Sequence, residues 1–118
     1  MKRLLLALVA VSLPIAAAAP ALAHTTVRET SIADNAALSA PPATFTVTFS
    51  APTGLASVTL TNAAGREIAL DYAPPRTRAA AFTIPLPALA PGVYTIAWRT
   101  MASDGHVMPG AIRFTVAG

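Results

Sequence analysis

The chain has 118 residues, with eight Lys or Arg, five Asp or Glu, and no cysteine. The lack of cysteine excludes disulfides, thiolate zinc sites and cysteine catalysis. Two of the basic residues lie at positions 2 and 3, so residues 24–118 hold six arginines against five acids, a net charge of +1. Blocks of Lys and Arg with interleaved aromatics, which indicate nucleic-acid binding, do not occur, and no nucleic-acid partner is expected.

The first 23 residues have the pattern of a secretory signal peptide. A basic start is followed by an apolar run, residues 4–19, and then by an A-x-A motif that ends at Ala23. This order is typical of a cleaved leader and not of a membrane anchor. We therefore expect cleavage after Ala23, and a mature chain, residues 24–118, that forms one small domain. We expect this domain to be a monomer that does not insert into a membrane.

Most of the mature chain alternates between apolar and polar residues, which is the pattern of half-buried β-strands. TFTVTF (44–49) places two phenylalanines and a valine on one face, and VYTIAW (93–98) groups a tyrosine, an isoleucine and Trp98. Turn signals rich in Pro, Gly and Asp separate these stretches. In chain order, the predicted strands lie near 25–30, 44–49, 55–62, 66–71, 79–84, 92–100 and 110–117.

About seven short strands at this spacing predict an all-β fold, an immunoglobulin-like Greek-key β-sandwich or barrel of antiparallel strands. We expect Trp98 and the phenylalanines to lie in its core. If successive strands cross the sandwich in alternating directions, three segments meet at one pole: the start of the mature chain, the loop 50–54 and the loop 101–109.

Both histidines of the chain are predicted at that pole. His24 becomes the first residue after cleavage, and His106 lies two residues after Asp104 in the sequence MASDGHVMPG. An N-terminal histidine can bind a metal through its α-amine and its ring together. The amine has a reference pKa of about 7.7–8.0, so it loses its proton to a metal more readily than lysine does. With the His106 ring and the Asp104 carboxylate, the donors are three nitrogens and one oxygen, which suits tetragonal Cu(II).

Simpler interpretations of these residues stay open. A histidine beside a cleavage site can arise by chance, and Asp104-Gly105 is a common hairpin-turn pair, so His106 can be merely an exposed residue after a turn. Zinc also accepts nitrogen and oxygen donors, in a tetrahedral arrangement. Met101 and Met108 flank the loop and are soft ligands for Cu(I), but packing is the favoured role for both.

The chain resembles the CopC family of periplasmic copper-binding proteins. The resemblance covers essentially all of residues 24–118, including VTFSAP (47–52) and PGVYTIAWRTMASDGHVMPGAIRFTV (91–116). It implies a Greek-key β-barrel of immunoglobulin-like form that holds one Cu(II) ion in the periplasm. The ligands that it implies are His24, through amine and ring, with Asp104 and His106.

The chain departs from the family pattern at Ala51, where members often carry a glutamate near the metal, in the sequence F-S-E-P. The loss of this carboxylate would loosen the site or leave a position for water. No methionine-rich segment for a second, Cu(I) site is present. Many relatives are fused to, or neighbour, a multi-spanning membrane protein. Since this chain ends at Gly118, we expect a membrane copper-transport partner to be a separate polypeptide.

These observations predict a copper carrier or buffer in copper homeostasis and resistance, without enzymatic turnover. A copper monooxygenase is one alternative, because lytic polysaccharide monooxygenases also bind copper through an N-terminal histidine on a β-sandwich. Such enzymes need a flat face with exposed aromatics, whereas most of the seven Phe, Tyr and Trp here occupy positions predicted to face inward. A metal-free secreted interaction module is the other alternative.

Overall fold

The computed structural model describes residues 25–118, so the predicted signal peptide and His24 lie outside the described residues. This part of the chain forms seven strands and no helix, and therefore has no helix that could cross a membrane. The strands are β1 (Val27–Thr30), β2 (Ala36–Leu38), β3 (Thr44–Asn62), β4 (Glu67–Ile68), β5 (Ala79–Pro85), β6 (Gly92–Met101) and β7 (Val107–Val116).

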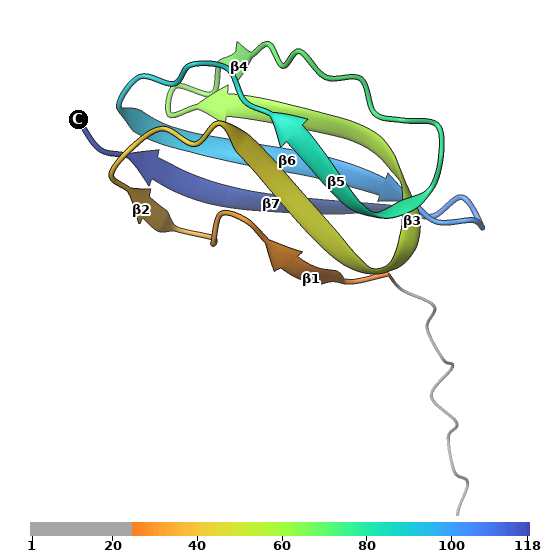
Figure 1. The fold of residues 1–118 in the computed structure, drawn as a ribbon. Helices are drawn as coiled ribbons and strands as arrows, with labels where there is room; N and C mark the ends of the chain where they lie inside the picture. Colours follow the sequence, from red (N-terminus) through yellow and green to blue (C-terminus); the bar gives the residue numbers. More distant parts are fainter. Residues whose placement is uncertain (1–24) are drawn as a thin grey trace, which may run out of the picture.

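Strand β3 belongs to both layers of the fold (Figure 1). Its first half pairs antiparallel with β1 on one side and with β5 on the other. Its second half pairs antiparallel with β4 and β6, and the layer continues through β7 to β2. Between the halves the strand curls around residues 50–54. Its pairing register with β5 shifts between Thr48 and Thr53, and its register with β6 shifts between Leu55 and Ser57. The result is a seven-stranded sheet that curls around one core.

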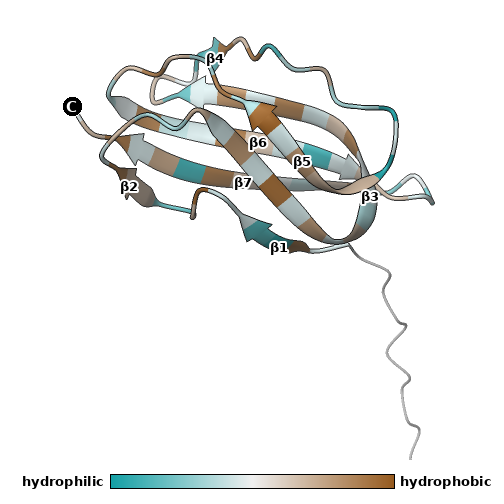
Figure 2. Cartoon of the chain, viewed as in Figure 1, coloured by the Kyte–Doolittle hydropathy of each residue, from teal (hydrophilic) through white to brown (hydrophobic). Residues whose placement is uncertain are grey.

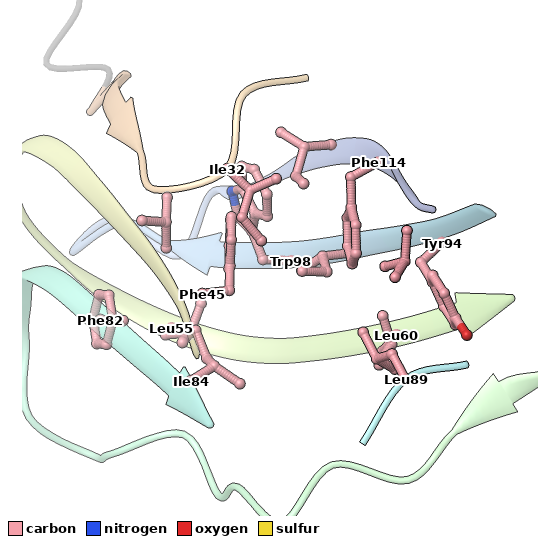
Figure 3. Packing of buried hydrophobic residues seen from close by; sticks show 14 of the residues in the cluster. Ile32, Phe45, Leu55, Leu60, Phe82, Ile84, Leu89, Tyr94, Trp98 and Phe114 are labelled. Carbon is pink, nitrogen blue, oxygen red and sulfur yellow. The ribbon is translucent and has the colours of Figure 1, made fainter. Parts of the chain in front are cut away.

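The core consists of the inward-facing side chains of both layers (Figure 3). Apolar and polar residues alternate along the strands, which appears as brown and pale bands in Figure 2. Phe45 of β3 lies against Trp98 of β6, with ring centroids 5.7 Å apart, and Tyr94 stacks on Phe114 at 5.6 Å. The expectation that Trp98 and the phenylalanines form the core is confirmed, since all five are buried.

The predicted all-β class is confirmed, but the loop expected at 50–54 is wrong. The predicted strands 44–49 and 55–62 are the two halves of β3, which continues through Pro52 and Gly54. Proline and glycine inside a strand often mark a bend or bulge and not a turn. Here pairing persists on both sides of the bend, because Thr53 pairs with Ala79 and Gly54 with Met101.

Two further strands differ from the prediction. The stretch expected at 66–71 forms only the two-residue β4. The short strand β2 was not predicted, since three residues are too few to show a periodicity. It pairs parallel with β7, Ala36 opposite Phe114, so the sheet is mixed and not wholly antiparallel. The Greek-key connectivity stays a prediction.

Glycine at position 110 is required by the packing of Trp98. The two residues are paired across β6 and β7, and a Cβ atom at position 110 would lie 2.4 Å from the indole ring. The ring is held in the core by Phe45, so it has little room to move aside.

We therefore expect Gly110→Ala to lower the free energy of unfolding by about 1–3 kcal/mol, the usual cost of overpacking a core. Urea denaturation followed by the fluorescence of Trp98, the single tryptophan of the chain, measures this change. Ala111→Ser, at an exposed position of the same strand, is the control and should change stability by less than about 0.5 kcal/mol. Equal stability of Gly110→Ala and the parent protein would contradict the proposed contact.

Candidate metal centre

Three segments that are distant in sequence meet at one pole of the sandwich (Figure 1). The backbone N–H of Thr26 donates to Ser50 Oγ at 3.0 Å, and the Thr26 carbonyl accepts the N–H of Ser50 at 2.8 Å. Gly54, after the bend of β3, pairs with Met101, the last residue of β6. The loop 102–106 follows directly. The predicted meeting of the chain start with the segments 50–54 and 101–109 is therefore confirmed from residue 25 onward.

The loop 102–106 is a tight turn closed by backbone hydrogen bonds. Ala102 donates its N–H to the carbonyl of His106 at 2.8 Å, and Gly105 donates to the carbonyl of Ala102 at 3.0 Å. Gly105 has a φ of 88°, in the left-handed region that glycine adopts without strain. The Asp-Gly pair thus forms the turn that its sequence predicts, and it presents Asp104 and His106 on the same short loop.

Asp104 holds the side chain of His106 in a defined orientation. One carboxylate oxygen, Oδ1, accepts the backbone N–H of His106 at 3.0 Å, and the other, Oδ2, lies 2.6 Å from the ring atom Nδ1. Both side chains are exposed, His106 by 71% and Asp104 by 62%. Because Nδ1 is engaged by the carboxylate, Nε2 is the ring nitrogen that is free to bind an ion.

The hydrogen bonds from His106 lower the pKa of the Asp104 carboxyl below its ordinary value, the backbone N–H contributing most and the ring next. Asp104 is therefore anionic throughout the neutral range. A carboxylate that engages one nitrogen of a histidine directs the other nitrogen toward a metal and raises its basicity. The same carboxylate is also an oxygen donor of the kind that divalent ions accept. The pair can thus supply one nitrogen ligand with either an oxygen ligand or an orienting group.

The described residues alone do not complete a metal site. Within residues 25–118, no three His, Cys, Asp or Glu side chains are close enough together to hold an ion. The pair Asp104–His106 supplies two donors, and His24, the third predicted ligand, lies outside the described residues. Ala51 is exposed on the β3 bend and contributes no donor side chain.

Two buried threonines, which the sequence did not single out, donate hydrogen bonds to the residues that flank the loop 102–106. Thr53 is 1% exposed and donates its hydroxyl to the carbonyl of Met101 at 3.3 Å. Thr100 is 5% exposed and donates to the carbonyl of Met108, also at 3.3 Å. Their only signal in the sequence is a hydroxyl residue at positions that face the core.

The two methionines beside the loop differ in burial. Met108 is half-buried, as a packing role predicts, whereas Met101 is 45% exposed. The side chain of Met101 lies on the outer face of β6, and its packing role stays a prediction.

Comparison with known proteins places this fold in a family. The model of the CopC domain matches residues 27–117. The chain belongs to the CopC family. No curated protein matches the chain.

Solved structures of CopC-type proteins resemble the CopC domain described here. CopC from Methylosinus trichosporium OB3b has a TM-score of 0.65 and 23% identity, covering 80% of this chain and 94% of that one. PcoC, a methionine-rich copper resistance protein from Escherichia coli, has a TM-score of 0.62 and 26% identity, covering 80% and 99%. Its selenomethionine form has a TM-score of 0.58 and 25% identity, covering 77% and 98%. PcoC is methionine-rich, whereas this chain contains three methionines in 118 residues.

The contact between Asp104 and His106 should be visible in the titration of the Asp104 carboxyl. A lowered pKa means that the carboxylate keeps its contacts with His106 as the pH falls, and loses them only below the ordinary pKa of 3.8. The midpoint of the Asp104 carboxyl carbon resonance should therefore lie below 3.8 in the metal-free protein. In His106→Ala, which retains the backbone N–H but not the ring, this midpoint should rise part of the way toward the ordinary value. A midpoint at or above the ordinary value in the parent protein would show that the contact does not form in solution.

Proposed function

We propose that the mature protein, exported to the periplasm after cleavage at Ala23, binds one Cu(II) ion as a carrier or buffer in copper homeostasis and resistance. The proposed ligands are the amine and ring of His24, with Asp104 and His106. The observation that carries the proposal is the Asp104–His106 pair, which leaves Nε2 free at the pole where the described chain begins. Membership of the CopC family supports copper as the metal.

Chain connectivity supports the inclusion of His24. Thr26 is hydrogen-bonded to Ser50 at the bend of β3, at the same pole as the loop 102–106. Two residues of extended chain span at most about 7 Å, so residue 24 is tethered within that distance of residue 26. Cleavage after Ala23 would convert the amide nitrogen of His24 into a free amine that can bind a metal.

The donor set favours Cu(II) over zinc. Three nitrogens and one oxygen suit the tetragonal geometry of Cu(II), which also binds more tightly than zinc at matched ligands. Zinc prefers a tetrahedral arrangement of donors. The oxidising space outside the cytoplasm favours the Cu(II) state as well.

The exposure of the site favours binding and release over catalysis. Both described donors are more than half exposed, so an incoming partner can reach the ion directly. Six of the seven aromatic residues are buried, which leaves residues 25–118 without the exposed aromatic face that polysaccharide-cleaving copper enzymes use: Phe45, Phe49, Phe82, Tyr94, Trp98 and Phe114. We therefore propose a monomeric binding protein without turnover, which exchanges copper with a separate membrane transport protein.

Spin resonance of Cu(II) bound to the processed protein tests this proposal. We expect one ion per chain with three nitrogen ligands, and His106→Ala should remove one of the three. Asp71→Asn, which alters an exposed carboxylate in the segment after β4, is the matched control and should leave the spectrum unchanged. Copper should also raise the melting temperature of the parent protein, because a ligand of the native state stabilises it by mass action.

Two results would count against the proposal. An identical nitrogen pattern in His106→Ala would remove His106 from the site. Failure of the processed protein to take up Cu(II), with melting unaffected by excess copper, would favour the metal-free interaction module.

A further inference from the structure

A pocket of about 360 Å³ adjoins the metal pole, beside the loop 102–106. It is lined by residues 54–56 of β3, residues 74–76 of the segment that precedes β5, and Met101 at the end of β6. Arg76 is the single charged residue of this lining, and most of the remaining wall is apolar. The pocket therefore has a mostly apolar lining with one cationic side chain.

Exposed apolar side chains gather at the same pole. Val27, Met101 and Val107 are the large apolar residues with exposed side chains in the described part of the chain, each 45% exposed. Met101 and Val107 are direct partners across β6 and β7, and Val27 pairs with Phe49 just before the bend of β3. Met101 and Val107 thus form an exposed apolar pair that adjoins the pocket, and exposed apolar surface of this kind is typical of an interaction site.

Four of the six arginines of the mature chain also lie at this end. Arg76 lines the pocket, and Arg78 precedes Ala79, which pairs with Thr53 at the β3 bend. Arg99 lies two residues before Met101, so both side chains emerge on the same outer face of β6. The fourth is Arg28, next to Val27 in β1.

None of these arginines has a carboxylate partner. All are exposed, and the one contact between a carboxylate and a basic side chain within residues 25–118 joins Asp104 to His106. Two carboxylates lie at this end of the molecule, Glu29 and Asp104, and the second is already engaged with His106. The surface around the pocket is therefore positively charged, although the mature chain as a whole is nearly neutral.

We propose that this surface, the pocket with Arg76, Arg78 and Arg99, is a docking site for an acidic segment of a partner protein. Apolar side chains of the segment would enter the pocket and cover Met101. Carboxylates between them would pair with the arginines, whose planar guanidinium groups bind carboxylates in a bidentate manner. A concave pocket fits a chain segment better than it fits a flat membrane surface. The segment would lie beside the metal site, and a role in copper exchange rests on the proposed function, whereas the docking itself does not.

The probe for this proposal is a fluorescent twelve-residue peptide in which glutamate alternates with leucine, added to metal-free protein at low ionic strength. Anisotropy measures its binding. We expect Arg76→Gln/Arg99→Gln to weaken binding roughly tenfold, since each exposed ion pair contributes a few-fold. Arg66→Gln/Arg113→Gln removes the same charge from exposed positions away from the pocket and should change affinity less than about twofold. Raising the salt concentration should weaken binding by the parent protein.

Two further peptides separate the contributions to binding. Replacing the glutamates by glutamine, or the leucines by serine, should each weaken binding severalfold, because the proposal needs both carboxylates and apolar side chains. In nuclear magnetic resonance spectra, the peptide should shift the amides of Ala56 and Met101. It should leave Asn62 and Tyr94, which line a pocket formed by other segments, unaffected.

Several results would overturn the proposal. These are no binding of the alternating peptide, equal losses in the two arginine pairs, or shifts confined to residues away from the pocket. Binding to vesicles containing phosphatidylglycerol, with loss in Arg76→Gln/Arg99→Gln but no peptide binding, would assign the surface to a membrane instead. Because the assay uses metal-free protein, its outcome is independent of whether copper binds at His24, Asp104 and His106.

Discussion

Strand β3 passes through both layers and so determines which segments meet at the metal pole. The strand curls at residues 50–54 and keeps its backbone pairing on either side. On one side of the bend Ser50 binds the backbone of Thr26, and on the other Gly54 and the hydroxyl of Thr53 bind Met101. One segment thereby brings the start of the described chain and the base of the loop 102–106 to the same pole.

The chemistry of the proposed site follows from this placement. Strand β6 ends at Met101 and β7 begins at Val107. The loop between them is therefore too short to extend away from the pole. Within that loop, Asp104 engages one ring nitrogen of His106 and leaves the other free. Exposure of both side chains leaves the proposed site open to an incoming partner, as the proposed carrier role requires. The arginines and the apolar pocket beside the loop are consistent with exchange through a bound partner.

Much of the fold could be predicted from the sequence, because alternation of apolar and polar residues directly reflects which strand face is buried. Phe45 and Trp98 are examples, and the Asp104-Gly105 turn followed from the conformational freedom of glycine. The prediction of a loop at Pro52 was wrong, because a proline indicates a local deviation of the backbone but not whether the strand ends there. A three-residue strand such as β2 shows no period at all.

The candidate site was predictable in part for a similar reason. The alternating direction of successive strands was enough to predict that the chain start and His106 lie at one pole. This prediction held although two predicted strands are one strand, because β3 reverses direction at its bend. The hydrogen bond between Asp104 and Nδ1 depends on side-chain conformation, which no spacing reveals. The hydroxyl of Thr53 depends likewise on a tertiary contact with Met101. The clustering of arginines around the pocket depends on the segment that precedes β5, whose path no sequence pattern indicates.

The proposed copper site depends on cleavage after Ala23, which would create a metal-binding amine beside Asp104 and His106. The most direct measurement compares Cu(II) affinity, by competition with a chelator, for protein that begins at His24 and protein that retains Ala23. Retention of Ala23 turns the amine into an amide, so we expect a loss of affinity of at least about a hundredfold, with an unchanged fold by circular dichroism. Equal affinity of the two forms would contradict it.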